Sequence, residues 1–231
     1  MARKPSRNGR SAASKEKVHV GLLIDESGSM AGKQEPVVNG INGFVEALRA
    51  DEADATVVAT LSMFDLNGNE PIVRPKFKAI PIDEVAPLGA GDYVPRGMTP
   101  LNDAVIKTIR GMSRAVRKGD RAMLVIITDG LENASEAPSS EVRKLILAKE
   151  QAGWEFIYLG ANQDAWAESE KIGLAQAGKS LAWSATRTGT MDALGVSAER
   201  AKSFRDDPER YKAELSDVAR NVDEEKRRRK R

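Results

Sequence analysis

The sequence of 231 residues predicts an α/β protein with a mostly parallel sheet covered by helices on both faces. Residues 18–24 and 122–127 are continuous apolar runs of strand length, and each run ends abruptly at a polar loop. Such runs are typical of parallel strands that are buried on both faces of a sheet. Segments with apolar residues at helical spacing alternate with strand-like runs, which indicates a doubly wound fold.

The first half of the chain supplies one helix and two more strands. After the first strand, a helix is expected at residues 37–48, where apolar side chains recur at Val37, Ile41, Phe44, Val45 and Leu48. Strands are expected at residues 56–64 and 72–77. Pro71 and Pro75 restrict the latter strand to an edge of the sheet, because proline has no N–H to donate to a ladder.

The second half of the chain continues the alternation. A loop rich in Gly and Pro, residues 89–100, precedes a helix with apolar side chains at Leu101, Val105, Ile109, Met112 and Val116. The strand at 122–127 follows. The remaining elements are a helix at 140–151, a strand at 154–159, a helix at 164–172 and a short strand at 181–184. The prediction is therefore a sheet of six strands.

Charge divides the chain into three regions. The formal net charge is +2, yet residues 1–17 hold six basic side chains against one acid, and residues 222–231 hold six against three. The segment between them is therefore acidic. We expect a disordered basic arm at residues 1–17, which lack a run of bulky apolar side chains. We expect a single domain at 18–195 and a charged helical extension at 196–231 that ends in a basic tail.

Composition limits the chemistry that the chain supports. It has no cysteine and one histidine, His19, which lies in an apolar run. These counts exclude disulfides, cysteine nucleophiles, iron–sulfur clusters and zinc sites built from cysteine or several histidines. A metal bound by this chain would be held by oxygen atoms, which favours Mg²⁺, Mn²⁺ or Ca²⁺.

Three loops carry hydroxyl and carboxylate side chains next to core elements. Residues 25–29 follow the first strand, residues 97–101 lead into a helix, and residues 128–130 follow the strand at 122–127. Ligands of open parallel sheets bind outside the carboxyl ends of the strands, so we expect these loops to meet. Their oxygen atoms suit Mg²⁺ or Mn²⁺ with some positions left to water. The side chains are Asp25, Ser27, Ser29, Thr99 and Asp129.

The same residues match a known family in order and spacing. Residues 25–29 contain Asp-x-Ser-x-Ser, Thr99 lies within Gly-x-Thr-Pro-Leu-x-Asp-Ala, and Asp129 lies within Thr-Asp-Gly. Together they resemble the metal-ion-dependent adhesion site (MIDAS) of von Willebrand factor type A (VWA) domains. Residues 153–162, Gly-Trp-Glu-Phe-Ile-Tyr-Leu-Gly-Ala-Asn, are also similar to uncharacterised bacterial and bacteriophage members with an intact site. The resemblance covers about residues 18–184.

The resemblance implies details of the fold and of the site. It implies that one short antiparallel strand, residues 72–77, lies at an edge of the sheet. The two motif serines, Ser27 and Ser29, would bind the cation through their hydroxyls, and Thr99 would bind it directly or through water. The two motif aspartates would supply negative charge, directly or through water. The family's usual ligand is an acidic side chain of a partner protein, which completes the octahedron.

The predicted function is a binding module rather than an enzyme. A cation held by two carboxylates and neutral hydroxyls stays electron-poor, so it favours one more carboxylate from an Asp or Glu of a protein partner. Prokaryotic members of the family act in intracellular assemblies, including assemblies with AAA-type ATPases, and such an assembly is the expected partner. We expect a cytoplasmic protein without membrane contact. Residues 1–17 lack the apolar segment of a secretory signal, and no run of ~18 apolar residues is present.

Two other functions stay open at this point. The basic tail could bind nucleic-acid phosphates, which would make the chain a nucleic-acid- or virion-associated structural protein, and a merely solubilising tail fits equally well. A metal-dependent hydrolase is the more distant alternative, because no histidine follows the first strand to act as a base near Ser27 or Ser29. The tail residues are Lys226, Arg227, Arg228, Arg229, Lys230 and Arg231.

Four further acidic side chains are not expected to bind the cation. Glu26 is expected to point to solvent or to cap a helix, and Asp65 and Asp92 are expected to be solvated loop acids. Asp103 is expected to be structural, accepting hydrogen bonds from backbone amides of the Thr99 loop.

Overall fold

The computed structural model describes residues 16–49, 55–68, 70–161, 163–175, 179–183 and 187–229. The strands are β1 (Lys17–Asp25), β2 (Thr56–Asn67), β3 (Glu70–Pro81), β4 (Arg121–Thr128), β5 (Trp154–Gly160) and β6 (Ser180–Ala182). The α-helices are α1 (Gln34–Arg49), α2 (Leu101–Ser113), α3 (Ser139–Gln151), α4 (Gln163–Lys171), α5 (Arg187–Asp206) and α6 (Pro208–Arg229). Short 3₁₀ helices lie in the loops at Gly28–Met30, Ile82–Glu84 and Ala90–Asp92.

The strands of the described chain form one six-stranded sheet in the order β3-β2-β1-β4-β5-β6. Neighbouring strands are parallel except β2 and β3, which pair antiparallel at one edge. This arrangement confirms the predicted doubly wound fold with an antiparallel edge strand. With 12 residues, β3 is longer than the expected segment 72–77, because its pairing with β2 continues from Glu70 to Pro81. Its prolines lie on an edge strand, as their missing N–H groups require.

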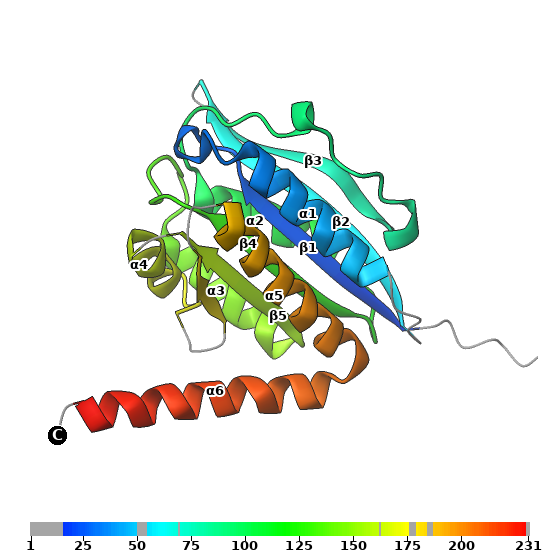
Figure 1. Cartoon of the computed structure of the whole chain (residues 1–231), viewed down its shortest axis with the longest axis vertical. Coiled ribbons are helices and arrows are strands. Elements are labelled where there is room, and N and C mark those ends of the chain that lie inside the picture. The colour runs from blue at the N-terminus through cyan, green and yellow to red at the C-terminus, as the bar shows by residue number, and fades with distance from the viewer. Residues whose placement is uncertain are drawn as a thin grey trace, which may run out of the picture.

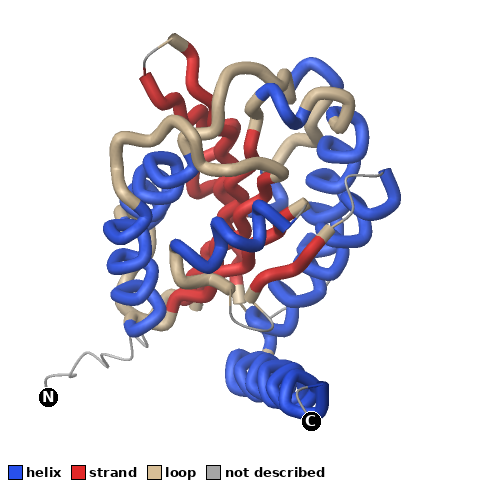
Figure 2. Tube along the Cα trace, turned by 90° about the vertical axis from the view of Figure 1, so that its left-hand side faces the viewer, coloured by secondary structure: helices blue, strands red, loops and turns tan. Residues whose placement is uncertain are grey.

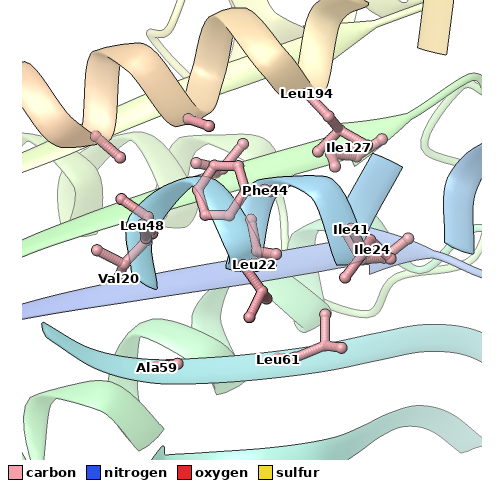
Figure 3. Close-up of a cluster of buried hydrophobic side chains, with 14 of the residues drawn as sticks. Val20, Leu22, Ile24, Ile41, Phe44, Leu48, Ala59, Leu61, Ile127 and Leu194 are labelled. Atoms are coloured by element: carbon pink, nitrogen blue, oxygen red, sulfur yellow. The ribbon is translucent and has the colours of Figure 1, made fainter. Parts of the chain in front are cut away.

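Helices cover both faces of the sheet (Figures 1 and 2), with α1 and α5 on one face and α2 and α3 on the other. Alternate strand residues face the two layers. In β1, Leu22 and Ile24 belong to the apolar cluster under α1 and α5, whereas Leu23 belongs to the cluster under α2 and α3. Figure 3 shows part of the first cluster, where Phe44 of α1 and Leu194 of α5 meet the strand residues. The two clusters bury β1 on both sides, which explains its continuous apolar sequence.

Helix α5 is part of the core. It runs from Arg187 to Asp206, so the domain boundary expected at residue 195 falls inside it, and the helical region begins earlier than residue 196. Leu194, Ala198 and Phe204 are all buried in the cluster that α5 shares with α1. A Cβ atom on Gly40 of α1 would lie only 2.4 Å from Leu194 Cδ1, so the two helices approach closely at this glycine.

The end of α5 and the start of α6 are held at the end of the sheet where the parallel strands begin. The buried Arg205 guanidinium donates to the backbone oxygen of Leu48 at 3.2 Å, near the end of α1. Arg121, the first residue of β4, donates to the backbone oxygens of Phe204 and Arg205, the latter at 2.8 Å. Tyr211 of α6 packs edge-on against Phe204 with ring centroids 5.5 Å apart. From there α6 runs along the base of the molecule in Figure 1.

Parts of the two predicted basic arms fall outside the described residues. These parts are residues 1–15 at the start and Lys230 and Arg231 at the end. The backbone of α6 continues to Arg229, and its side chains are described as far as Val218. Among the helices that the structure describes, none is both long and apolar enough to cross a bilayer.

Candidate metal site

The carboxyl ends of β1 and β4 bring two of the predicted loops together. The parallel register pairs Ile24 with Ile127, so Asp25 and Thr128 are the next residues on neighbouring strands. Thr128 Oγ1 donates a hydrogen bond to Asp25 Oδ2 at 2.6 Å. The strand order reverses between β1 and β4, since β2 and β3 extend to one side and β5 and β6 to the other. This is the switch point at which open α/β sheets bind ligands.

Asp25 is fully buried and held from several sides. Its Oδ1 accepts a hydrogen bond from the backbone N–H of Ser27 at 2.8 Å, and its backbone oxygen accepts one from the Tyr93 hydroxyl at 2.5 Å. Burial raises the pKa of Asp25 to about 6, against the opposing effect of the hydrogen bonds from Thr128 and Ser27. The loop therefore fixes this carboxylate before any ligand arrives.

The two serine hydroxyls connect Asp25's loop to Asp129. Ser27 Oγ lies 3.0 Å from Ser29 Oγ, and Ser29 Oγ donates to Asp129 Oδ1 at 2.7 Å. Ser27 and Asp129 are buried, while Ser29 is exposed. These contacts place side-chain oxygen atoms from the β1 and β4 loops in one continuous group at the sheet edge.

Thr99 joins the same group from the loop before α2. A Cβ atom on Gly130 would lie 3.4 Å from both Ser29 Oγ and Thr99 Oγ1, so the two hydroxyls flank one small space. Asn133 holds the threonine in place: its Oδ1 accepts from Thr99 N at 2.9 Å, and its N–H donates to Thr99 O at 3.2 Å. Gly97, with φ 68°, sits against Leu66, where a Cβ would lie 2.0 Å from the backbone oxygen. Only glycine fits this step of the loop.

The structure thus brings together all five residues that the sequence singled out for cation binding. Their donor set, two carboxylates and three hydroxyls, suits a hard cation with water in its remaining positions. Within the described part of the chain, no group of three or more His, Cys, Asp or Glu side chains is arranged so that it could hold a metal ion. The residues that would hold a cation are Asp25, Ser27, Ser29, Thr99 and Asp129.

Sequence reasoning did not single out Lys33, which lies at this site. Its ammonium group donates to Asp129 Oδ2 in a short ion pair and to the backbone oxygen of Ser29 at 2.6 Å. Lys33 lies four residues after Ser29, beyond a turn in which Gly32 adopts φ 82°. In the sequence, a lysine close to the loop of Ser27 and Ser29 could have indicated this contact. The sequence does not show where the Lys33 side chain points, because that depends on the turn at Gly32. Lys33 places a positive charge where Asp129 would face a cation.

A second buried network, also missed, stiffens the edge of the site. The expectation that Asp65 is solvated is wrong, and so is the expectation that Glu26 points to solvent or caps a helix, because both carboxylates are buried and bind partners outside the helices. Arg74 of β3 pairs with Glu26 and, at 2.9 Å, with Asp65, and Arg96 pairs with Asp65 at 2.8 Å. Val94 N also donates to Glu26 Oε1. These contacts join β1, β2 and β3 to the loop that carries Thr99.

The remaining acidic residues and the histidine lie outside the donor group. Asp103 is structural, as expected, but it accepts from the amides of Glu136 and Ala137, at 3.0 and 3.1 Å, rather than from the Thr99 loop. Asp92 keeps a largely exposed side chain that accepts from Gly89 N. His19 is buried near the opposite end of β1, where its Nε2 lies 3.1 Å from Asp120 Oδ2.

Comparison with solved structures supports the fold. No family model and no curated protein sequence matches the chain. Among solved structures, a von Willebrand factor type A protein from Catenulispora acidiphila is 16% identical with a TM-score of 0.60, over 81% of this chain and 43% of that one. The chain has a VWA-type fold.

Two other VWA-like matches come from different kinds of protein. Proximal thread matrix protein 1 of the mussel byssus, in a structure with a zinc-occupied MIDAS motif, is 17% identical with a TM-score of 0.58, over 79% of this chain and 47% of that one. The pilus adhesin SpaC of Lactobacillus rhamnosus GG is 14% identical with a TM-score of 0.65, over 84% of this chain and 31% of that one. The chain spans less than half the length of these structures, and at such identities the likeness concerns the fold.

Proposed function

We propose that this protein is a divalent-cation-dependent binding module that recognises an acidic group on a partner protein. The observation that carries the proposal is the convergence of five oxygen-bearing side chains, from three separate loops, at the switch point of the sheet. We propose Mg²⁺ or Mn²⁺ as the cation, because both favour oxygen ligands. The zinc-occupied MIDAS of the mussel protein supports a divalent cation at such a site.

The charge of the donor group supports an acidic ligand. Asp25 and Asp129 carry two formal negative charges, and the other donors are neutral hydroxyls. A divalent cation held by them keeps open positions and gains from an additional carboxylate. An Asp or Glu side chain of a partner supplies that oxygen together with the charge.

Exposed apolar side chains in the same loops support protein binding over small-molecule chemistry. Val94, Met98 and Leu131 are 51%, 46% and 44% exposed. Val94 and Met98 lie in the loop before α2, and Leu131 lies in the loop after β4. The loop before α2 is joined to the β1 loop by a hydrogen bond from Gly28 N to Gly97 O at 3.0 Å. Exposed apolar side chains that gather in one region mark interaction sites. We infer that the partner's acidic residue is flanked by apolar ones.

The chemistry of the donor group gives little support to catalysis. The described side chains around it include no imidazole, and Lys33 is engaged with Asp129 and Ser29. We propose that the partner belongs to an intracellular assembly of bacterial or bacteriophage origin. An assembly that contains an AAA-type ATPase is one example. Nucleic-acid binding by the basic tail, Lys226 to Arg231, stays a prediction. The start of α6 lies at the opposite edge of the sheet from the metal loops, so the two activities would be separable.

A pull-down from lysate of the source organism tests the proposal. The tagged full chain is incubated with Mg²⁺, Mn²⁺ or EDTA, and retained proteins are identified by mass spectrometry. We expect at least one protein to be retained with either cation, released by EDTA, and absent with Asp25→Ala or Thr99→Ala. Asp83→Ala removes an exposed acid far from the site and serves as the matched control. The proposal would be contradicted if the same proteins were retained with EDTA present and by both site variants.

A further inference from the structure

We propose a second binding site, for a small organic anion with an apolar body, in the hollow between α2 and the β2–β3 ladder. The hollow has a volume of about 460 Å³. This lies within the range of ligand pockets, roughly 300–1,000 Å³. None of the five candidate cation ligands lines it, so this inference is independent of the proposed function.

Small side chains on the sheet explain why space remains under α2. Thr60 and Ser62 of β2 face the hollow, and the register places Gly21 of β1 beside Thr60. Gly21 admits Met112 of α2, since a Cβ there would lie 2.5 Å from its sulfur. The helix therefore packs tightly over β1, while the small residues of β2 leave the neighbouring volume unfilled.

An irregularity in β3 forms the outer wall. Ala59 pairs with Ile80 and Leu61 with Phe77, so Lys78 and Ala79 together lie opposite the single residue Thr60. This is a β-bulge, a feature that re-aims side chains at sheet edges and near sites. Ala79 has φ 52°, and its N–H donates to Thr60 Oγ1 at 3.1 Å. The bulge turns Lys78 towards the rim of the hollow.

A buried hydroxyl in the wall has no partner. Thr108 of α2 is 4% exposed, and its Oγ1 has no hydrogen-bond partner among the described residues. Threonine in a helix commonly bonds to the carbonyl four residues earlier, so this free hydroxyl is unusual. Buried unsatisfied groups are costly, and a bound molecule or water commonly satisfies them. Thr108 therefore offers a ligand one specific hydrogen bond inside the hollow.

The charge at the rim defines the ligand. Among the described side chains that line the hollow none is acidic and four are basic: Lys78, Lys107, Arg110 and Arg114. Arg110 also pairs with Glu141 at 3.3 Å, but both side chains are exposed, so this pair offsets little of the Arg110 charge. The inner surface is apolar, with Val73, Met112 and Ala115. The ligand that fits has an apolar body inside and a carboxylate, sulfonate or phosphate at the rim.

A pair of matched probes tests this site on the full chain. The anionic probe is 8-anilinonaphthalene-1-sulfonate, and the neutral probe is N-phenyl-1-naphthylamine, which lacks only the sulfonate. We expect the anionic probe to bind at least about tenfold more tightly in a fluorescence titration. We also expect it to shift the backbone amide NMR signals of Ala79, Thr108 and Gly111.

Matched variants localise the binding. Gly111→Leu puts a side chain into the hollow, and Gly43→Leu is its control, because a Cβ at either helical glycine meets no atom within 4 Å. Arg114→Glu at the rim is matched by Lys118→Glu outside it. Only Gly111→Leu and Arg114→Glu are expected to weaken binding of the anionic probe, by about tenfold or more. Equal affinity for the two probes, or equal effects of site and control variants, would overturn the proposal.

Discussion

Lys33 and Asp129 form an ion pair across two loops that lie 96 residues apart in the chain. Both side chains are largely buried, and the same lysine also donates to the backbone oxygen of Ser29. The ammonium group and a divalent cation would therefore compete for one carboxylate. A cation that draws on Asp129 would therefore weaken its ion pair with Lys33.

Lys33→Gln is expected to tighten Mn²⁺ binding. Removing a competing charge worth about 1 kcal/mol corresponds to an affinity gain of about fivefold. Isothermal titration with Mn²⁺ measures the change directly. Lys33→Arg keeps the competing charge and should bind Mn²⁺ like the wild type, as should Lys118→Gln, which alters an exposed lysine elsewhere. A glutamine variant with no gain in affinity would refute competition by Lys33.

Gly97→Ala is expected to destabilise the protein more than Gly68→Ala. Both glycines have φ 68°, so alanine suffers the same backbone strain of about 1–2 kcal/mol at each. A Cβ at Gly97 would also lie 2.0 Å from the Leu66 oxygen, whereas a Cβ at Gly68 meets nothing within 4 Å. Urea denaturation should show an excess loss of about 1–3 kcal/mol for Gly97→Ala. Equal losses would mean that the loop yields and that the close approach is not required.

Arg74→Met is expected to destabilise the protein by about 3 kcal/mol, because it leaves the buried Glu26 without its arginine and leaves Asp65 with Arg96 alone. Glu26 and Asp65 both bind this arginine, and their side chains are 4% and 0% exposed. Arg96→Met should cost less than about 1 kcal/mol, because Arg96 is half exposed and Asp65 keeps Arg74. Thermal and urea unfolding of both variants provide the comparison. A milder effect for Arg74→Met than for Arg96→Met would show that this network is misassigned.

Glu155 on β5 is expected to make stability depend on pH. Burial raises the pKa of this carboxyl above its ordinary value, despite the nearby Lys179 and Lys212. The folded state therefore holds its proton more tightly than the unfolded chain, so stability falls as the pH rises above the ordinary glutamate pKa. Glu155→Gln should be more stable than the wild type at pH 7.5, with a smaller difference at pH 4.5. Urea unfolding at several pH values tests this, and a glutamine variant that is less stable at pH 7.5 would contradict it.

The fold and the five candidate ligands could be predicted because each depends on local patterns. The apolar runs of β1 and β4 end at Asp25 and Thr128, and the fold rules place such ends at one edge. Lys33 and Arg74 could not be predicted, since their partners are set by a loop turn and by the β2–β3 register. The position of α5 in the core could not be predicted, because its buried face contains small residues such as Ala198 and Ala201. These residues give only a weak apolar pattern in the sequence.

The hydrogen bonds Thr128–Asp25 and Ser29–Asp129 join residues 103 and 100 positions apart. No short stretch of the chain contains the whole oxygen set, so it assembles only after β1 and β4 have paired. A cation that binds there would bind the native state and not the unfolded chain, and it would stabilise folding by mass action, about 2.7 kcal/mol at a hundred times its dissociation constant. Because proteases act mainly on opened chains, cation supply would also set how long the protein survives.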